Sequence, residues 1–126
     1  MKIATFNINN INKRLYNLTT WLSREQPDVV CLQELKVEQR AFPASALRDL
    51  GYPGVWLVER SWNGVAILAR ECDPVLTRSS LPGNPDDRQA RYIEAAVRKS
   101  SAKKLRFVLI RLPNQILEQG AMQTGQ

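Results

Sequence analysis

The fold of this chain is decided by the stretch Pro27-Asp28-Val29-Val30-Cys31-Leu32-Gln33-Glu34. A proline ends the preceding element, an apolar run follows, and the run stops on polar side chains. Such a continuous apolar run is typical of a strand that is covered on both faces. An upstream strand ends in the same way, on Asn7. Because open sheets carry ligands and catalytic groups at their strand ends, Asn7 and Glu34 are the first candidates for a functional site.

Outward from this stretch, the pattern alternates strand and helix and then continues as hairpins. Apolar residues at helical spacing predict a helix over 12–25, and a second helix begins at Phe42-Pro43 and ends near Gly51. The expected strands cover residues 2–9, 29–34, 55–58, 65–69, 74–77, 92–97 and 105–112. This order predicts an α/β fold with one mixed sheet and helices on one face. The chain has few residues left to cover the other face.

Length and composition place the chain among globular proteins. With 126 residues, 44% of them apolar and 24% charged, it is one small domain or a piece of a larger one. No apolar run is long enough to span a membrane, and no signal segment is seen, so no membrane partner is expected. The two cysteines, Cys31 and Cys72, have no metal-site spacing. They favour free thiols in a reducing, cytoplasmic environment over a disulfide.

The basic balance of the chain is unevenly distributed. The net charge is +6, but residues 98–126 carry six basic residues against Glu118 alone. Residues 1–97 are therefore nearly neutral. A solvated basic tail explains this distribution better than a nucleic-acid-binding patch.

Four segments of the chain resemble, in their order and spacing, the exonuclease III family of the endonuclease/exonuclease/phosphatase superfamily. They are residues 4–9 (ATFNIN), 27–36 (PDVVCLQELK), 62–68 (WNGVAIL) and 86–94 (DDRQARYIE). The resemblance is strongest over residues 1–97. It implies a partial four-layer α/β sandwich in which residues 1–114 form the N-terminal half of the family's domain. Residues 115–126 form an off-pattern tail.

The resemblance also implies an activity, namely hydrolysis of DNA phosphodiesters at 3′ ends and abasic sites with Mg2+, or with Mn2+ in its place. DNA is then the implied partner. Glu34 takes the role of metal ligand, and Asn7 lies beside it, so that both are candidate catalytic and metal-site residues. The chemistry of the residues agrees, because Mg2+ binds oxygen ligands and keeps several waters, so that one or two carboxylates suffice.

Further candidates are substrate-binding residues. Lys36 and Arg91 have the chemistry to hold backbone phosphates, although solvated charges at strand ends explain them equally well. Asn63 either contacts a phosphate or forms the turn before its strand, and the turn is favoured. Lys13 and Arg14 are expected to face solvent.

The resemblance ends after residue 97. Arg111 stands where the family has a tyrosine, and the later Gly-Asp-x-Asn and Ser-Asp-His motifs are absent, as is any histidine. We therefore expect a truncated chain that is inactive on its own. Two alternatives remain: a fragment of another phosphoesterase of the superfamily, or a non-catalytic fragment. The oligomeric state is left open.

Overall fold

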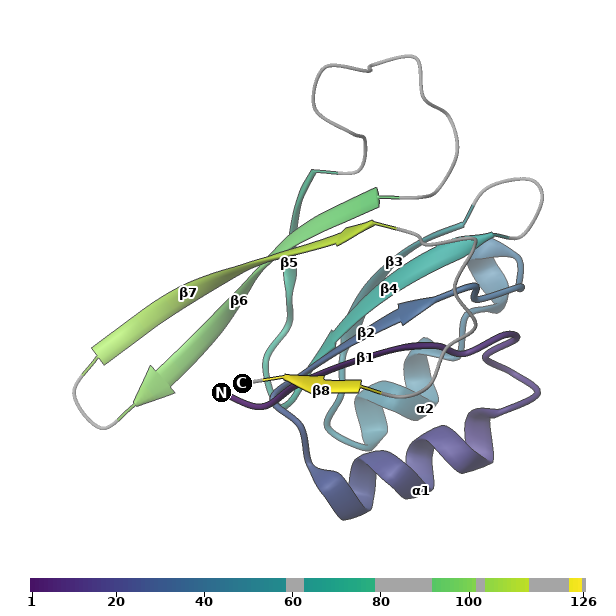
Figure 1. Ribbon diagram of the computed structural model, residues 1–126, viewed down its shortest axis with the longest axis horizontal. Helices are drawn as coiled ribbons and strands as arrows, with labels where there is room; N and C mark the ends of the chain where they lie inside the picture. Colours follow the sequence, from purple (N-terminus) through teal and green to yellow (C-terminus); the bar gives the residue numbers. More distant parts are fainter. Residues whose placement is uncertain (59–62, 79–91, 102–103, 114–122, 126) are drawn as a thin grey trace.

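The computed structural model describes residues 1–58, 63–78, 92–101, 104–113 and 123–125. Strands and helices alternate in its first half, and strands fill the second half (Figure 1). The strands are β1 (Ile3–Asn7), β2 (Val29–Gln33), β3 (Gly54–Val58), β4 (Gly64–Ala69), β5 (Val75–Arg78), β6 (Tyr92–Ser101), β7 (Lys104–Pro113) and β8 (Gln123–Gly125). The helices are α1 (Leu15–Glu25), the 3-10 helix η1 (Gln39–Ala41) and α2 (Ala44–Asp49).

The main sheet is five-stranded and mixed, in the order β3-β4-β2-β1-β8. β1 and β2 are parallel neighbours, joined through α1, with Asn7 opposite Gln33. The other pairs are antiparallel, and β8 lies along the start of β1. Parallel neighbours need such a crossover, so that the predicted strand-helix-strand unit is confirmed.

The two faces of the main sheet contribute to two apolar cores. The helix-side core contains Phe6 and Leu32 from the sheet, together with Leu18, Leu22 and Leu47 from the helices. The intersheet core lies on the opposite face and combines residues of β2 and β4 with residues of β6. Both faces of β2 are therefore buried, as its continuous apolar run predicted.

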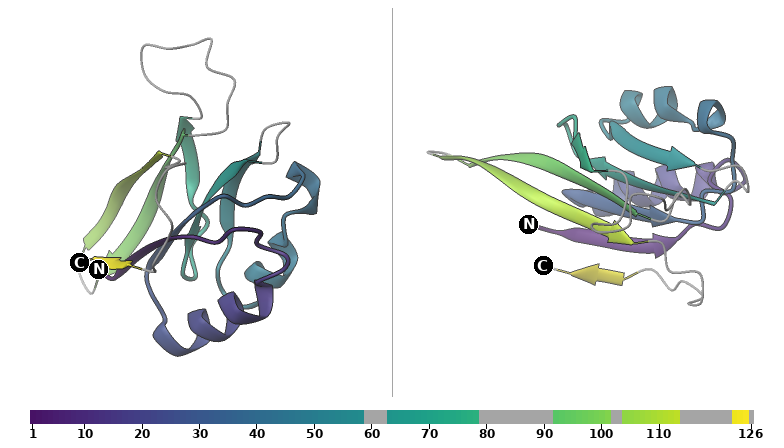
Figure 2. Two further views of the ribbon diagram at one scale, coloured as in Figure 1. Left: turned by 45° about the vertical axis from the view of Figure 1, so that its right-hand side comes forward. Right: turned by 90° about the horizontal axis from the view of Figure 1, so that it is seen from above.

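The expectation of a single sheet with an uncovered second face needs a correction. β5, β6 and β7 form a separate three-stranded sheet, and Ile93, Ala95 and Val97 of β6 are buried against the main sheet. Figure 2 shows this second sheet on the side of the main sheet away from the helices. The change of sheet follows the turn after β4, where Glu71 has a left-handed φ of 55°.

Helix α1 begins at Leu15 rather than at residue 12. The side chain of Asn10 accepts a hydrogen bond from the Lys13 backbone N–H, which favours a turn over residues 11–14 in place of helix. At its other end, Gln26 adopts a left-handed conformation and donates its N–H to the Leu22 carbonyl. No helix of the described ranges is long and apolar enough to cross a membrane.

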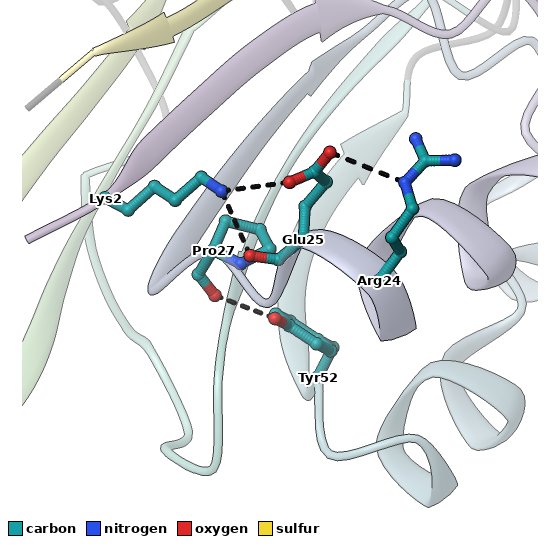
Figure 3. Close-up of polar contacts among 5 residues, drawn as sticks. All are labelled: Lys2, Arg24, Glu25, Pro27 and Tyr52. Carbon is teal, nitrogen blue, oxygen red and sulfur yellow. Dashed lines mark hydrogen bonds and ion pairs between the residues drawn. The ribbon is translucent and has the colours of Figure 1, made fainter.

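Polar contacts fix the connection between α1 and β2 (Figure 3). Lys2 Nζ donates to the Glu25 carbonyl at 3.0 Å and pairs with its carboxylate at 3.3 Å. The buried Tyr52 hydroxyl donates to the Pro27 carbonyl at 2.8 Å. These contacts hold the end of α1 against the start of β1 and against the segment that follows α2. They thereby fix the position at which β2 begins.

Candidate functional site

Three strand ends meet at one edge of the main sheet, which we call the site edge and define by Asn7, residues 33–36 and residues 63–64. The Ile8 N–H donates to the Gln33 carbonyl at 3.0 Å, and the Leu35 N–H donates to the Gly64 carbonyl at 3.2 Å. The ends of β1 and β2 thus lie beside the start of β4. The predicted adjacency of the strands that carry Asn7 and Glu34 is confirmed.

The backbone at this edge is unusual on both sides of Leu35. Glu34 and Lys36 have left-handed φ values of 53° and 49°, while Leu35 between them is fully buried in the helix-side core. The charged ends of Glu34 and Lys36 consequently approach each other, with Lys36 Nζ 3.9 Å from Glu34 Oε2. A left-handed residue that is not glycine is strained by about 1–2 kcal/mol. Such strain concentrates at functional sites.

Asn9 connects the two strand ends, and sequence reasoning gave it no role of its own. Its N–H donates to Asn7 Oδ1 at 3.0 Å, and its own Oδ1 accepts from Lys36 Nζ at 2.5 Å. Its carbonyl accepts from Arg14 Nε at 3.3 Å, and Arg14 is exposed, as expected, while it makes this contact with the loop. Asparagine tolerates the left-handed backbone that both Asn9 and Asn10 adopt. Two consecutive asparagines directly after the first strand were therefore the sequence signal that could have predicted this loop.

Of the two remaining predicted site residues, the structure places Asn63 but not Arg91. Asn63 directly precedes β4 at the site edge and is half-buried. Arg91 lies outside the described residues, so its predicted phosphate contact stays a prediction.

Six non-glycine residues of the described part of the chain have a positive φ. Four of them follow the ends of β1 and β2, namely Asn9, Asn10, Glu34 and Lys36.

The donor set at the site edge suits a hydrated cation with oxygen ligands. The Glu34 side chain is 19% exposed, so that its carboxylate is accessible yet held by its surroundings. Within the described part of the chain, no group of three or more histidine, cysteine, aspartate or glutamate side chains could hold a metal ion. The site edge therefore offers a partial coordination sphere, which fits Mg2+ with most of its waters retained and does not fit a closed structural zinc site.

A cavity of about 820 Å3 lies at the opposite edge of the sheet and is separate from this site. Its lining includes Asp28 and Arg70, which pair at 3.1 Å, and Cys72. Asp28 precedes β2 and Arg70 follows β4, so that the cavity lies at the far ends of the strands. It contributes nothing to the site edge.

Residues 4–110 match the endonuclease/exonuclease/phosphatase family. The chain belongs to this family. Exodeoxyribonuclease III from Haemophilus influenzae is 37% identical over 95 residues, which cover 75% of this chain and 35% of that protein. Across the curated relatives it matches, the chain spans about a third of their length.

Solved structures of the same family superimpose on the chain. The 3′-5′ exonuclease NExo from Neisseria meningitidis is 43% identical, with a TM-score of 0.71, and the match covers 77% of this chain and 38% of that one. An AP endonuclease from Archaeoglobus fulgidus is 39% identical, with a TM-score of 0.68 and 77% and 37% covered. The NExo 3′ phosphatase from Neisseria, bound to a product DNA hairpin, matches equally well, at 43% identity. The α/β fold and the family resemblance predicted from the sequence are confirmed.

Proposed function

We propose that this chain supplies the amino-terminal part of the active site of an exonuclease III-type nuclease, which hydrolyses DNA phosphodiesters at 3′ ends and abasic sites with Mg2+. The observation that carries the proposal is Glu34, a carboxylate fixed by a strained backbone where β1, β2 and β4 meet. A strained backbone beneath a half-buried carboxylate is a feature that functional sites often share, and it supports the proposal. The family relatives named as exonucleases and AP endonucleases support the substrate class.

In this proposal Glu34 holds the metal through its carboxylate, and Asn7 orients the oxygens around it. When bound, Mg2+ (or Mn2+) neutralises the charge that develops on the phosphate oxygens. Lys36 and Arg91 hold the DNA backbone, and Asn63 at the start of β4 is placed to hydrogen-bond a phosphate oxygen. Asn9 is a positioning residue, because it ties Asn7 to Lys36 without itself facing the phosphate in our scheme.

The chain is not expected to turn over substrate by itself. Its sequence contains no histidine, and within the described residues no group of three or more histidine, cysteine, aspartate or glutamate side chains could hold a metal ion. A general base and further electrostatic stabilisation are required to complete the reaction. The proposed activity therefore belongs to a larger assembly of active-site groups, of which the site edge is one part.

The test begins with metal binding by the purified chain. We expect Glu34→Gln to weaken Mn2+ binding at least about tenfold, because the amide removes the charge that attracts the cation. Glu38→Gln is the matched control: Glu38 lies four residues further along, is 51% exposed and pairs with Arg40. Equal Mn2+ affinity in wild type and Glu34→Gln would reject the metal role of Glu34.

The substrate class is tested separately. The chain is incubated with an abasic-site duplex, a 3′-phosphorylated DNA hairpin and a small phosphate monoester, each with Mg2+ and with EDTA. Binding of the two DNA substrates without cleavage is the expected result. Cleavage of the monoester alone would support another phosphoesterase of the superfamily, and Mg2+-dependent cleavage of DNA would contradict the expected inactivity.

A further inference from the structure

The ammonium group of Lys36 already occupies the space beside the Glu34 carboxylate. It lies 3.9 Å from Glu34 Oε2, beyond hydrogen-bond length, and it donates to Asn9 Oδ1 at 2.5 Å. The Lys36 side chain is 47% exposed. It is thus held mainly by one neutral amide, while its charge faces the carboxylate that is proposed to bind metal.

A divalent cation at Glu34 would meet this ammonium group at close range. Mg2+ lies about 2 Å from a carboxylate oxygen, so that it and Lys36 Nζ would be separated by only a few ångströms. Like charges at this distance repel each other appreciably even near a protein surface. The exposed Lys36 side chain has room to turn away, whereas its left-handed backbone is fixed beside the buried Leu35.

We propose that Lys36 is an exchangeable counter-cation of Glu34: a divalent metal displaces its ammonium group, which then pairs with the phosphodiester that binds beside the metal. This inference rests on the proposed function and deepens it. It makes metal and phosphodiester binding cooperative, because each ligand favours the same position of Lys36. Such coupling is reciprocal, so that the metal tightens diester binding by the same factor.

The experiment measures Mn2+ binding to the full purified chain by electron paramagnetic resonance, with and without dimethyl phosphate, a phosphodiester that binds metal only weakly. For wild type we expect dimethyl phosphate to tighten Mn2+ binding by about three- to tenfold. For Lys36→Met we expect Mn2+ binding in the absence of diester to tighten by a similar, about three- to tenfold, factor and the diester effect to vanish. Lys13→Met is the control, since Lys13 is exposed and donates to Asn10 Oδ1 through its backbone N–H rather than its side chain.

Each outcome decides a different part of the argument. If Glu34→Gln loses Mn2+ while Lys36→Met binds it no more tightly than wild type, Glu34 remains a ligand and the exchange is refuted. If the diester effect persists in Lys36→Met, the cooperativity does not pass through Lys36 and the inference fails. If neither wild type nor Lys36→Met binds Mn2+, the metal role of the site edge fails, and the exchange falls with it.

Discussion

Gly64 stands at the point where the start of β4 supports the Glu34 segment, and its replacement by alanine tests that support. A Cβ at this position would lie 2.8 Å from Val58 Cγ2, 2.9 Å from the Leu57 carbonyl oxygen and 3.2 Å from Leu35 Cδ1. The Leu57 carbonyl is backbone of the β3–β4 pair and cannot rotate away. The strand ends must therefore separate.

The magnitude follows from these contacts. Carbon atoms pack best at about 3.5–4.0 Å, so that the new methyl group is too close to its neighbours by roughly half an ångström or more. Overpacking of this kind lowers the free energy of unfolding by about 1–3 kcal/mol. Because the Gly64 carbonyl accepts the Leu35 N–H, a displaced Gly64 also moves Leu35 and with it Glu34. We expect Mn2+ affinity to fall about threefold or more, as sites loosened by such shifts do.

Gly54→Ala provides the matched control. Its Cβ would lie 2.5 Å from Leu68 Cδ2 and 3.0 Å from the Ile67 carbonyl oxygen, so that it too makes close contacts in the same strand pair. Gly54 lies at the opposite end of that pair, far from the site edge. Urea unfolding followed by circular dichroism should show both variants destabilised by similar amounts, whereas Mn2+ titration should show a loss only for Gly64→Ala.

Two results would refute this reasoning. Wild-type stability in Gly64→Ala would mean that the start of β4 can absorb a methyl group without moving. Equal losses of Mn2+ affinity in both glycine variants would mean that general loosening of the sheet, rather than the contact through Leu35, controls the site.

Three further predictions concern the rest of the fold. Tyr52→Phe removes the buried hydrogen bond to the Pro27 carbonyl and should lower the free energy of unfolding by about 1–2 kcal/mol in urea titrations, and an unchanged midpoint would contradict the role assigned to it. Burial raises the pKa of the Cys31 thiol to about 12, so iodoacetamide at pH 8 should modify the half-buried Cys72 first, as read by mass spectrometry; equal rates would argue against this burial. The same raised pKa means that the unfolded chain loses the Cys31 proton at a lower pH than the folded chain does. The contribution of this thiol to the free energy of unfolding is therefore fully present below pH 9, and it falls toward pH 12 by up to about 1.4 kcal/mol per pH unit. Cys31→Ala should reduce this slope, leaving the part due to Tyr52, whose pKa burial also raises to about 12; an unaltered slope would exclude Cys31 as its source.

The sequence was sufficient for the elements that local pattern determines. The apolar run of β2 has no other stable environment than between two covered faces, and α1 is the connection that parallel β1 and β2 require. The adjacency of Asn7 and the Glu34 segment follows from the same topology. The free state of Cys31 and Cys72 also agrees with their spacing.

The sequence was not sufficient where tertiary contacts decide. Alternating apolar residues of β6 fit an extended main sheet as well as a second sheet, and the chain passes from the first to the second after the turn that follows β4. The left-handed backbone of Glu34 and Lys36 results from the burial of Leu35 and its bonds to Gly64 and Ile11. No local propensity encodes it, because glutamate and lysine disfavour that conformation.

The left-handed backbone at positions 34 and 36 creates an evolutionary trade-off between folding stability and ligand binding. Glycine would relieve the strain at both positions, and asparagine would relieve part of it. A laboratory population selected only for heat resistance should therefore enrich these residues there and discard the carboxylate and the ammonium group. Natural or laboratory lineages that keep Glu34 and Lys36 would do so under selection for ligand binding. The frequencies at these two positions would then report which pressure a lineage has experienced.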